Sequence, residues 1–259
     1  TTPDDAKAVD VVDPIWEKIS SSASAIDPAD KTSSTATVKF RGTDTYFTES
    51  TLTSDKIKVL VNGAEATGIT KELSEATALT QERKEFGKTT TTTKQYGVEY
   101  TLTIKGFAHD VDQVKVQLPA GTLVDESGNG NKVTELTLYN VLKSTETEIS
   151  STSAFLGNTS IQRQNIENVT FETSVPDTVY NATTGEYVNN TAWDVSAKQD
   201  KSIIAWYETS NNKGALKVHI GSNDEIFANQ NSSYLFANIG RADICTATET
   251  ITNINLLNV

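Results

Sequence analysis

The chain has 259 residues, of which hydrophobic types make up 36%. This length suits one large β-rich domain or two domains of common size, since a single core usually serves about 100 to 200 residues. With 34 acidic against 22 basic residues, the formal net charge is −12. A protein that neutralises phosphates needs a basic face, so the charge argues against nucleic acids and anionic membrane surfaces as partners. No stretch approaches the roughly 20 apolar residues of a spanning helix, so no membrane insertion is expected.

Alternation of apolar and polar residues is the main signal in the first half of the chain. It covers residues 14–20, 35–42, 56–62, 97–107, 113–118 and 133–140. A period of two buries one face of a strand and leaves the other in water. Turn sequences separate these segments, including Asn62-Gly63 and the ESGNGNK run at 126–132. The pattern predicts a mainly β fold, with an antiparallel sandwich of the immunoglobulin type over residues 1–142.

The alternation breaks at residues 73–87, where Ser74 precedes a Glu-rich run that ends at Gly87. Ser is a common residue at the start of a helix and Gly at its end. We therefore expect an irregular crossover with one short helical segment here.

A second unit is expected over residues 143–259. A Ser/Thr-rich stretch at 144–160 has few large apolar residues and suggests a boundary. Strand-like segments follow at 166–175 and 216–221, on either side of the stretch TAWDVSAKQDKSIIAWYE at 191–208. The second unit is thus predicted to be a smaller β-rich domain.

The last nine residues, ITNINLLNV, match the spacing L-x-x-L-x-L at Ile251, Ile254 and Leu256. This is the inward-facing pattern of one strand of a leucine-rich repeat, although Val259 stands where the repeat has asparagine. One such rung cannot bury its apolar face alone. The pattern therefore predicts that further repeats follow, that this chain is a fragment, and that residues 143–259 form an N-terminal cap ending in the first repeat strand.

Several short elements in order carry a resemblance to a known family. From TAWDVSAKQDKSIIAWY through LKVHIGSNDEIFANQNSSYLFANIG to ITNINLLN, residues 190–259 resemble the segment before the repeats in bacterial surface proteins of the BspA-like leucine-rich-repeat family. Upstream, DKIKVLVNG, YTLTIKGF and LPAGTLVDESGNGNK are similar to bacterial immunoglobulin-like modules.

The resemblance implies an extracellular protein, secreted or held at the bacterial cell surface, with a non-enzymatic role in adhesion. Its partner would be a host or bacterial surface protein or a glycan. The repeats that would carry the binding surface are missing from this sequence.

The stretch at 191–208 also permits an enzymatic hypothesis. A glycosidase would use two carboxylates, for example Asp194 with Asp200 or Glu208, one of them with a raised pKa. The alternative is a scaffold, in which residues 198–201 form a turn with Asp200 in solvent, and Trp193 and Trp206 pack as apolar anchors. Asp194 would then accept hydrogen bonds from backbone or from Ser196. We favour the scaffold, because the sequence supplies no partner that would perturb a carboxylate.

Histidine and cysteine are rare in this chain, with two residues and one residue. His109, Asp110 and Asp112 form a conceivable metal set, but hydrated turn residues account for them better. His219 is expected to be an ordinary sheet residue. The single cysteine, Cys245, cannot form an internal disulfide and is expected to be a small buried hydrophobic residue.

The DESGNGNK segment offers Asp125, Asn129 and Asn131 as conceivable Ca²⁺ ligands. A tight turn, with Gly128 and Gly130 at positive φ, explains it more simply. We therefore expect no catalytic, cofactor-binding or metal-binding residue in this chain, and no cofactor.

A second hypothesis is an extracellular carbohydrate-binding module, or an accessory domain of a carbohydrate-active enzyme. Trp16, Trp193 and Trp206 could stack on sugar rings if their faces were exposed. Burial of these side chains would argue against it.

Overall fold

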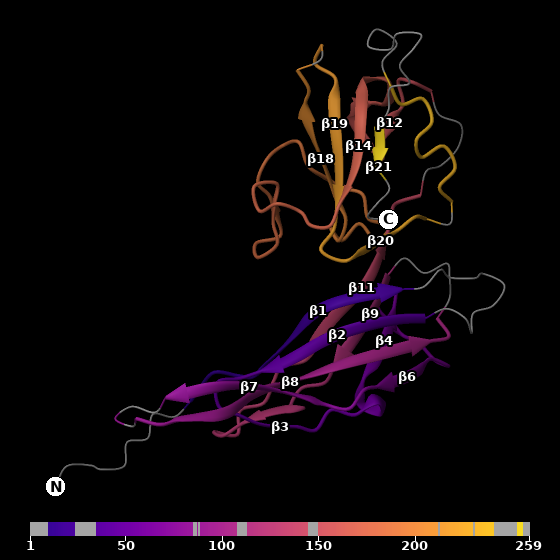
Figure 1. Cartoon of the computed structure of the whole chain (residues 1–259). Helices are drawn as coiled ribbons and strands as arrows, with labels where there is room; N and C mark the ends of the chain where they lie inside the picture. Colours follow the sequence, from indigo (N-terminus) through magenta and orange to yellow (C-terminus); the bar gives the residue numbers. More distant parts are fainter. Residues whose placement is uncertain are drawn as a thin grey trace. The chain divides into compact units, whose positions relative to one another are not determined.

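The computed structural model describes residues 10–23, 35–84, 87, 89–107, 113–144, 150–211, 213–229, 231–240 and 253–255. The fold is mainly β, as predicted, with several antiparallel sheets (Figure 1). The chain divides into two compact units. Unit 1 comprises Thr1–His109 with Lys115–Leu138, and unit 2 comprises Asp110–Val114 with Tyr139–Val259. Among the described residues, no helix has the length and apolar character needed to cross a membrane.

Unit 1 is built from strands joined by short turns. In chain order these are β1 (Ile15–Ala23), β2 (Thr35–Thr43), β3 (Phe47–Ser50), the 3₁₀ turn η1 (Ser54–Lys56), β4 (Lys58–Val61), β5 (Ala64–Glu65), β6 (Thr70–Leu73), β7 (Thr77–Lys84), β8 (Thr91–Lys105), β9 (Gln113–Leu118), β10 (Leu123–Asp125) and β11 (Thr134–Val141).

These strands form the two sheets of a sandwich-like fold. One has the order β1-β2-β8-β6, with β7 also pairing with β8. The other contains β11, β9, β4 and β5 as neighbours, and β10 pairs separately with β3. The antiparallel β2–β8 ladder is continuous from the pair Thr35 and Lys105 to the pair Thr43 and Gly97. Because side chains alternate along these strands, each sheet has one buried face.

Aromatic and aliphatic side chains fill the core of unit 1. Phe40 of β2 lies between Trp16 of β1 and Tyr100 of β8, with ring centroids 5.3 and 5.9 Å away. The indole Nε1 of Trp16 donates to Thr122 Oγ1 at 3.3 Å, which satisfies the polar atom of this buried ring. Trp16 therefore belongs to the core of unit 1, with only 5% of its surface exposed.

The expected short helical segment near residues 73–87 is wrong. Residues 77–84 form β7, which pairs antiparallel with β8 from Thr77 and Glu99 to Lys84 and Thr91 (Figure 1). Most side chains of β7 are exposed. The Thr-rich start of β8 favours extended backbone, and the ladder with β8 supplies hydrogen bonds that an isolated helix of one or two turns could not match.

Unit 2 contains shorter strands. These are β12 (Ala154–Phe155), β13 (Asn158–Gln162), the 3₁₀ turn η2 (Arg163–Asn165), β14 (Ile166–Glu172), β15 (Tyr180–Asn181), β16 (Glu186–Tyr187), β17 (Trp193–Asp194), β18 (Ile204–Thr209), β19 (Leu216–Gly221), β20 (Glu225–Phe227) and β21 (Asn253–Asn255). The end of β11 also belongs to this unit, and its residues 139–141 pair in parallel with β20.

The main sheet of unit 2 has the order β17-β18-β19-β14-β21. β18 and β19 are antiparallel, whereas β14 runs parallel to both of its neighbours, β19 and β21. One face of this sheet packs on the larger core of the unit, which contains Val169, Phe171, Ala205, Val218 and Ile220. On the other face, Ile204 and Trp206 form a smaller core with Val179.

The C-terminal repeat-like segment is described only at residues 253–255, which form β21. This strand pairs in parallel with β14, with Val169 opposite Ile254, and among the described residues it is the last strand on its side of the sheet (Figure 1). Ile251, Leu256 and Val259 of the predicted repeat pattern lie outside the described residues.

Phe40→Ala tests the packing of unit 1. Phe40 is fully buried, so truncation leaves a cavity and should lower the free energy of unfolding by about 3–5 kcal/mol. Urea unfolding measures this, with hydrogen exchange in β2 and β8 as the local readout. Ile19→Ala is the control, because Ile19 of β1 is 43% exposed and its truncation should change the stability little. Equal effects of the two changes would contradict the assigned core.

Candidate functional site

The stretch at 191–208 forms a hairpin. β17 pairs antiparallel with β18, Trp193 opposite Ala205 and Asp194 opposite Ile204, and a turn region connects them. Two residues of this connection, Gln199 and Lys201, have positive φ values of 54° and 63°. These are left-handed conformations that non-glycine residues rarely adopt, so the turn must be held by other interactions.

The carboxylate of Asp194 holds this turn. Its Oδ1 accepts hydrogen bonds from the backbone N–H and the hydroxyl of Ser196, at 2.8 and 2.6 Å. Its Oδ2 accepts from the backbone N–H of Lys201 at 2.8 Å. The predicted role of Asp194 as an acceptor for Ser196 and nearby backbone is therefore confirmed. Both oxygens are occupied by the turn itself, as in a structural Asx turn.

Asp200 is exposed but engaged in hydrogen bonds. Its Oδ1 accepts from Ser196 Oγ at 3.2 Å and from the Ser202 N–H at 3.1 Å, and its Oδ2 accepts from Gln113 Nε2 at 3.0 Å. Partial burial of the carboxylate group raises the pKa of Asp200, although the residue as a whole is exposed, but the hydrogen bonds from Ser202, Gln113 and Ser196 outweigh it and hold the pKa below its ordinary value. A general acid needs the opposite shift, so Asp200 does not have the property that a glycosidase acid requires.

The two tryptophans of the hairpin occupy different surroundings. Trp206 is 6% exposed and stacks on the ring of His219, with centroids 5.2 Å apart and an interplanar angle of 13°. Trp193 is half-buried against the larger core, and its Nε1 donates to the Leu156 carbonyl at 3.1 Å. Both pack as apolar anchors, as predicted.

His219 is a residue of β19, as expected. Its Nδ1 lies 2.9 Å from Glu172 Oε1 on β14, and its Nε2 is buried with no hydrogen-bond partner among the described residues. His109, Asp110, Asp112 and Cys245 lie outside the described residues.

The DESGNGNK segment forms the predicted tight turn. Asp125 Oδ1 accepts from the N–H groups of Ser127 and Asn129 at 2.9 and 2.8 Å, and Asn129 Nδ2 donates to Asp125 Oδ2 at 2.8 Å. Gly128 has a φ of +83°, as predicted. Gly130 does not adopt a positive φ, so that expectation is wrong. A Cβ at Gly130 would instead lie 3.1 Å from Gly121 Cα, so close approach of two backbone segments favours glycine there.

Asn131, the third conceivable Ca²⁺ ligand of this segment, is bonded to backbone groups instead. Its Oδ1 accepts from the N–H groups of Thr122 and Leu123, each at 2.8 Å, and its Nδ2 donates to the carbonyls of Pro119 and Lys132. Its amide is therefore used on both sides to hold the loop that precedes β10.

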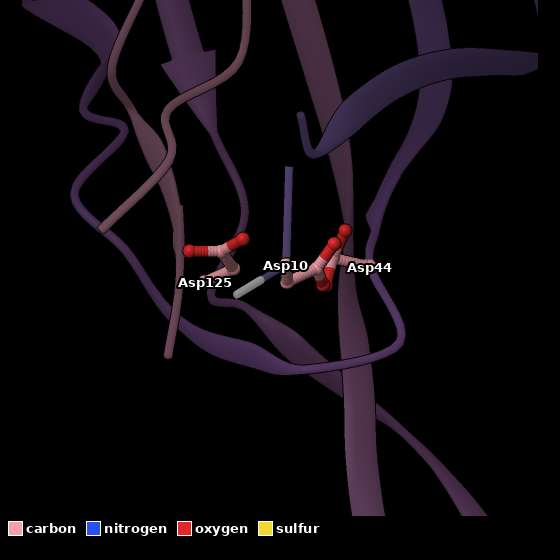
Figure 2. Close-up of side chains that lie close together, drawn as sticks. All are labelled: Asp10, Asp44 and Asp125. Carbon is pink, nitrogen blue, oxygen red and sulfur yellow. The ribbon is translucent and has the colours of Figure 1, made fainter. Parts of the chain in front are cut away.

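Asp125 instead joins two carboxylates from distant parts of unit 1. Asp10, Asp44 and Asp125 each bring a carboxylate oxygen within 4.8 Å of the others (Figure 2). Asp125 is 2% and Asp44 9% exposed, and Asp10 is half-buried. The backbone around this aspartate cluster is also connected, since Asn129 Nδ2 donates to the Asp10 carbonyl at 2.8 Å. Sequence reasoning missed the cluster, because its members lie 34 and 81 positions apart along the chain.

The three carboxylates of the aspartate cluster accept hydrogen bonds from nearby backbone groups, and they also repel one another when charged. Burial raises the pKa of Asp125, but hydrogen bonds from Asn129, Ser127 and Gly128 outweigh it and leave the pKa below its ordinary value. Asp44 Oδ1 accepts from the Tyr46 N–H at 2.6 Å, and Asp10 Oδ1 from the Val12 N–H at 3.0 Å. Carboxylate oxygens are the ligands that Ca²⁺ prefers, so these three residues are the described group that could hold a hard cation. Three ligands are fewer than the six to eight that Ca²⁺ takes, and carbonyl groups or water would have to supply the rest.

A buried arginine and an apolar cavity are two further features that the sequence did not reveal. Arg163 is 1% exposed, and its Nη1 donates to the carbonyls of Tyr234, Leu235 and Ala237 at 2.9–3.0 Å. Burial lowers the pKa of Arg163 to about 10.

The segment that Arg163 holds forms one wall of an apolar cavity of about 390 Å³. The residues that line it are Leu142, Phe171, Ala228, Ser232, Tyr234, Leu235, Phe236 and Ala237.

Comparison of the chain with known protein families, curated proteins and solved structures found no match.

The lowered pKa of Asp125 predicts an acid-sensitive unit 1. The stabilising contribution of this carboxylate is complete above the pKa of an unfolded aspartate, about 3.9, and is lost as the pH falls through the lower folded-state pKa. The hydrogen-exchange protection factors of β3 and β10, measured in urea, should therefore be lower at about pH 3 than at about pH 7.

Asp125→Asn should lower the hydrogen-exchange protection of β3 and β10 at neutral pH. It should also make the difference in protection between neutral and acidic pH smaller. Glu126→Gln is the control, because Glu126 is exposed and should leave the pH profile unchanged. An Asp125→Asn protein with the acid profile of the parent would contradict the role given to this carboxylate.

Asp194→Ala and Glu208→Ala separate the scaffold from the glycosidase hypothesis. Asp194 accepts three hydrogen bonds that hold the turn, so its loss should lower the free energy of unfolding of unit 2 by about 1–3 kcal/mol. Glu208 is exposed, and its loss should cost little. Urea unfolding followed by Trp fluorescence measures both. A glycosidase activity that both substitutions abolish, with unchanged stability, would overturn the scaffold role.

Proposed function

We propose that this chain is part of a non-enzymatic extracellular protein of the adhesin type, in which an immunoglobulin-like spacer precedes a cap for leucine-rich repeats. The observation that carries the proposal is the position of β21. This strand lies in the repeat-like C-terminal segment, pairs in parallel with β14, and is the outermost described strand of its sheet.

Parallel pairing is what a cap of this kind requires. Repeat strands stack in parallel, and each repeat buries its apolar face only against its neighbours. The sheet of unit 2 already changes from antiparallel, at β18 and β19, to parallel, at β19, β14 and β21. A further strand beside β21 would continue the parallel part and pair with the backbone groups on the outer side of β21, the last strand of this sheet in the described part of the chain.

The extracellular location and the spacer role of unit 1 rest on the resemblance of the sequence to bacterial surface proteins. Its two sheets bury their aromatic core within the unit, and their outer faces carry exposed ion pairs such as Arg41 with Glu17 and Lys58 with Glu65. Such surface pairs favour solubility and contribute little to stability. Adhesion to a surface protein or a glycan would then depend on the repeats, with the two β units displaying and capping them.

The cap can be tested by adding consensus leucine-rich repeats after Val259. If β21 is the first repeat strand, the added repeats should raise the urea midpoint of unit 2 and unfold together with it, because stability in such arrays comes from interfaces between neighbours. Hydrogen exchange in β14 and β19 reports on unit 2.

Ile254→Pro is the matched control in the extended protein, since proline removes a backbone donor from β21. It should abolish the gain and leave the midpoint of unit 1 unchanged. Independent unfolding of the repeats and unit 2, with no gain in midpoint, would refute the cap.

The alternative function, carbohydrate binding, has less support from the aromatic residues. Trp16 and Trp206 are 5% and 6% exposed, so neither has an open face for a sugar ring, and Trp193 is half-buried. Acrylamide should therefore quench the Trp fluorescence of the folded chain weakly compared with the urea-unfolded chain. Strong quenching that a bound oligosaccharide suppresses would favour the carbohydrate-binding function instead.

A further inference from the structure

We draw no further inference here: the strongest candidate, the apolar cavity that Leu142, Phe171, Leu235 and Phe236 line in unit 2, carries no proposal, because nothing in the described part of the chain shows what covers it.

Discussion

The parallel ladders on both sides of β14 are the constraint on which unit 2 depends. β14 pairs with β19 from Ile166 and Leu216 to Glu172 and Gly221, and with β21 on its other side. Parallel neighbours cannot be joined by a tight turn, so the chain must leave the sheet after β14 and return before β19. That excursion contains the small β15–β16 hairpin and then β17 and β18, which come back to the sheet beside β19.

The hairpin at 193–209 shows how this excursion is held. Ile204 and Trp206 point to one face of the sheet and Ala205 to the other, so both faces of β18 are buried. A strand that is buried on both faces needs apolar residues in succession, and the segment SIIAWY contains such a run. The carboxylates before it, Asp194 and Asp200, accept hydrogen bonds from residues of the turn between β17 and β18.

The two groups of aspartates in this chain differ in one physical respect. Around Asp194, donors from Ser196 and Lys201 reach both oxygens of the carboxylate. In the aspartate cluster, hydrogen bonds also hold Asp125, but they do nothing to remove its repulsion from Asp10 and Asp44. Repulsion between carboxylates weakens only with protonation, with distance or with a cation, and burial strengthens it. Protonation therefore has two opposed effects at this cluster, since it relieves the repulsion and also removes the charged acceptor that the hydrogen bonds to Asp125 stabilise.

Local pattern was informative where one strand face is buried and the other is wet. Residues 35–42, 113–118 and 216–221 alternate along their length, and each lies within a strand with closely matching bounds. The pattern failed at residues 77–84, where a short helical segment was expected. The serine, the glycine and the charged residues of this region also suit an exposed strand, and β8 provides the partner for it. It also misjudged Gly130, whose requirement comes from the approach of Gly121 and not from its own turn.

By itself the sequence determined the β class of this protein, its net negative charge and the positions of β1, β2, β4, β8, β9 and β11, and it favoured structural roles for Asp194 and Trp206. These features follow from composition, from periodicity or from residues close in the chain. Only the tertiary structure decided the strand order of the sheets, the parallel neighbours of β14, the three aspartates of the cluster, and the burial of Arg163. The reason is that these features join residues far apart along the chain. Their meeting depends on which strands pair, and short-range patterns carry no information about that choice.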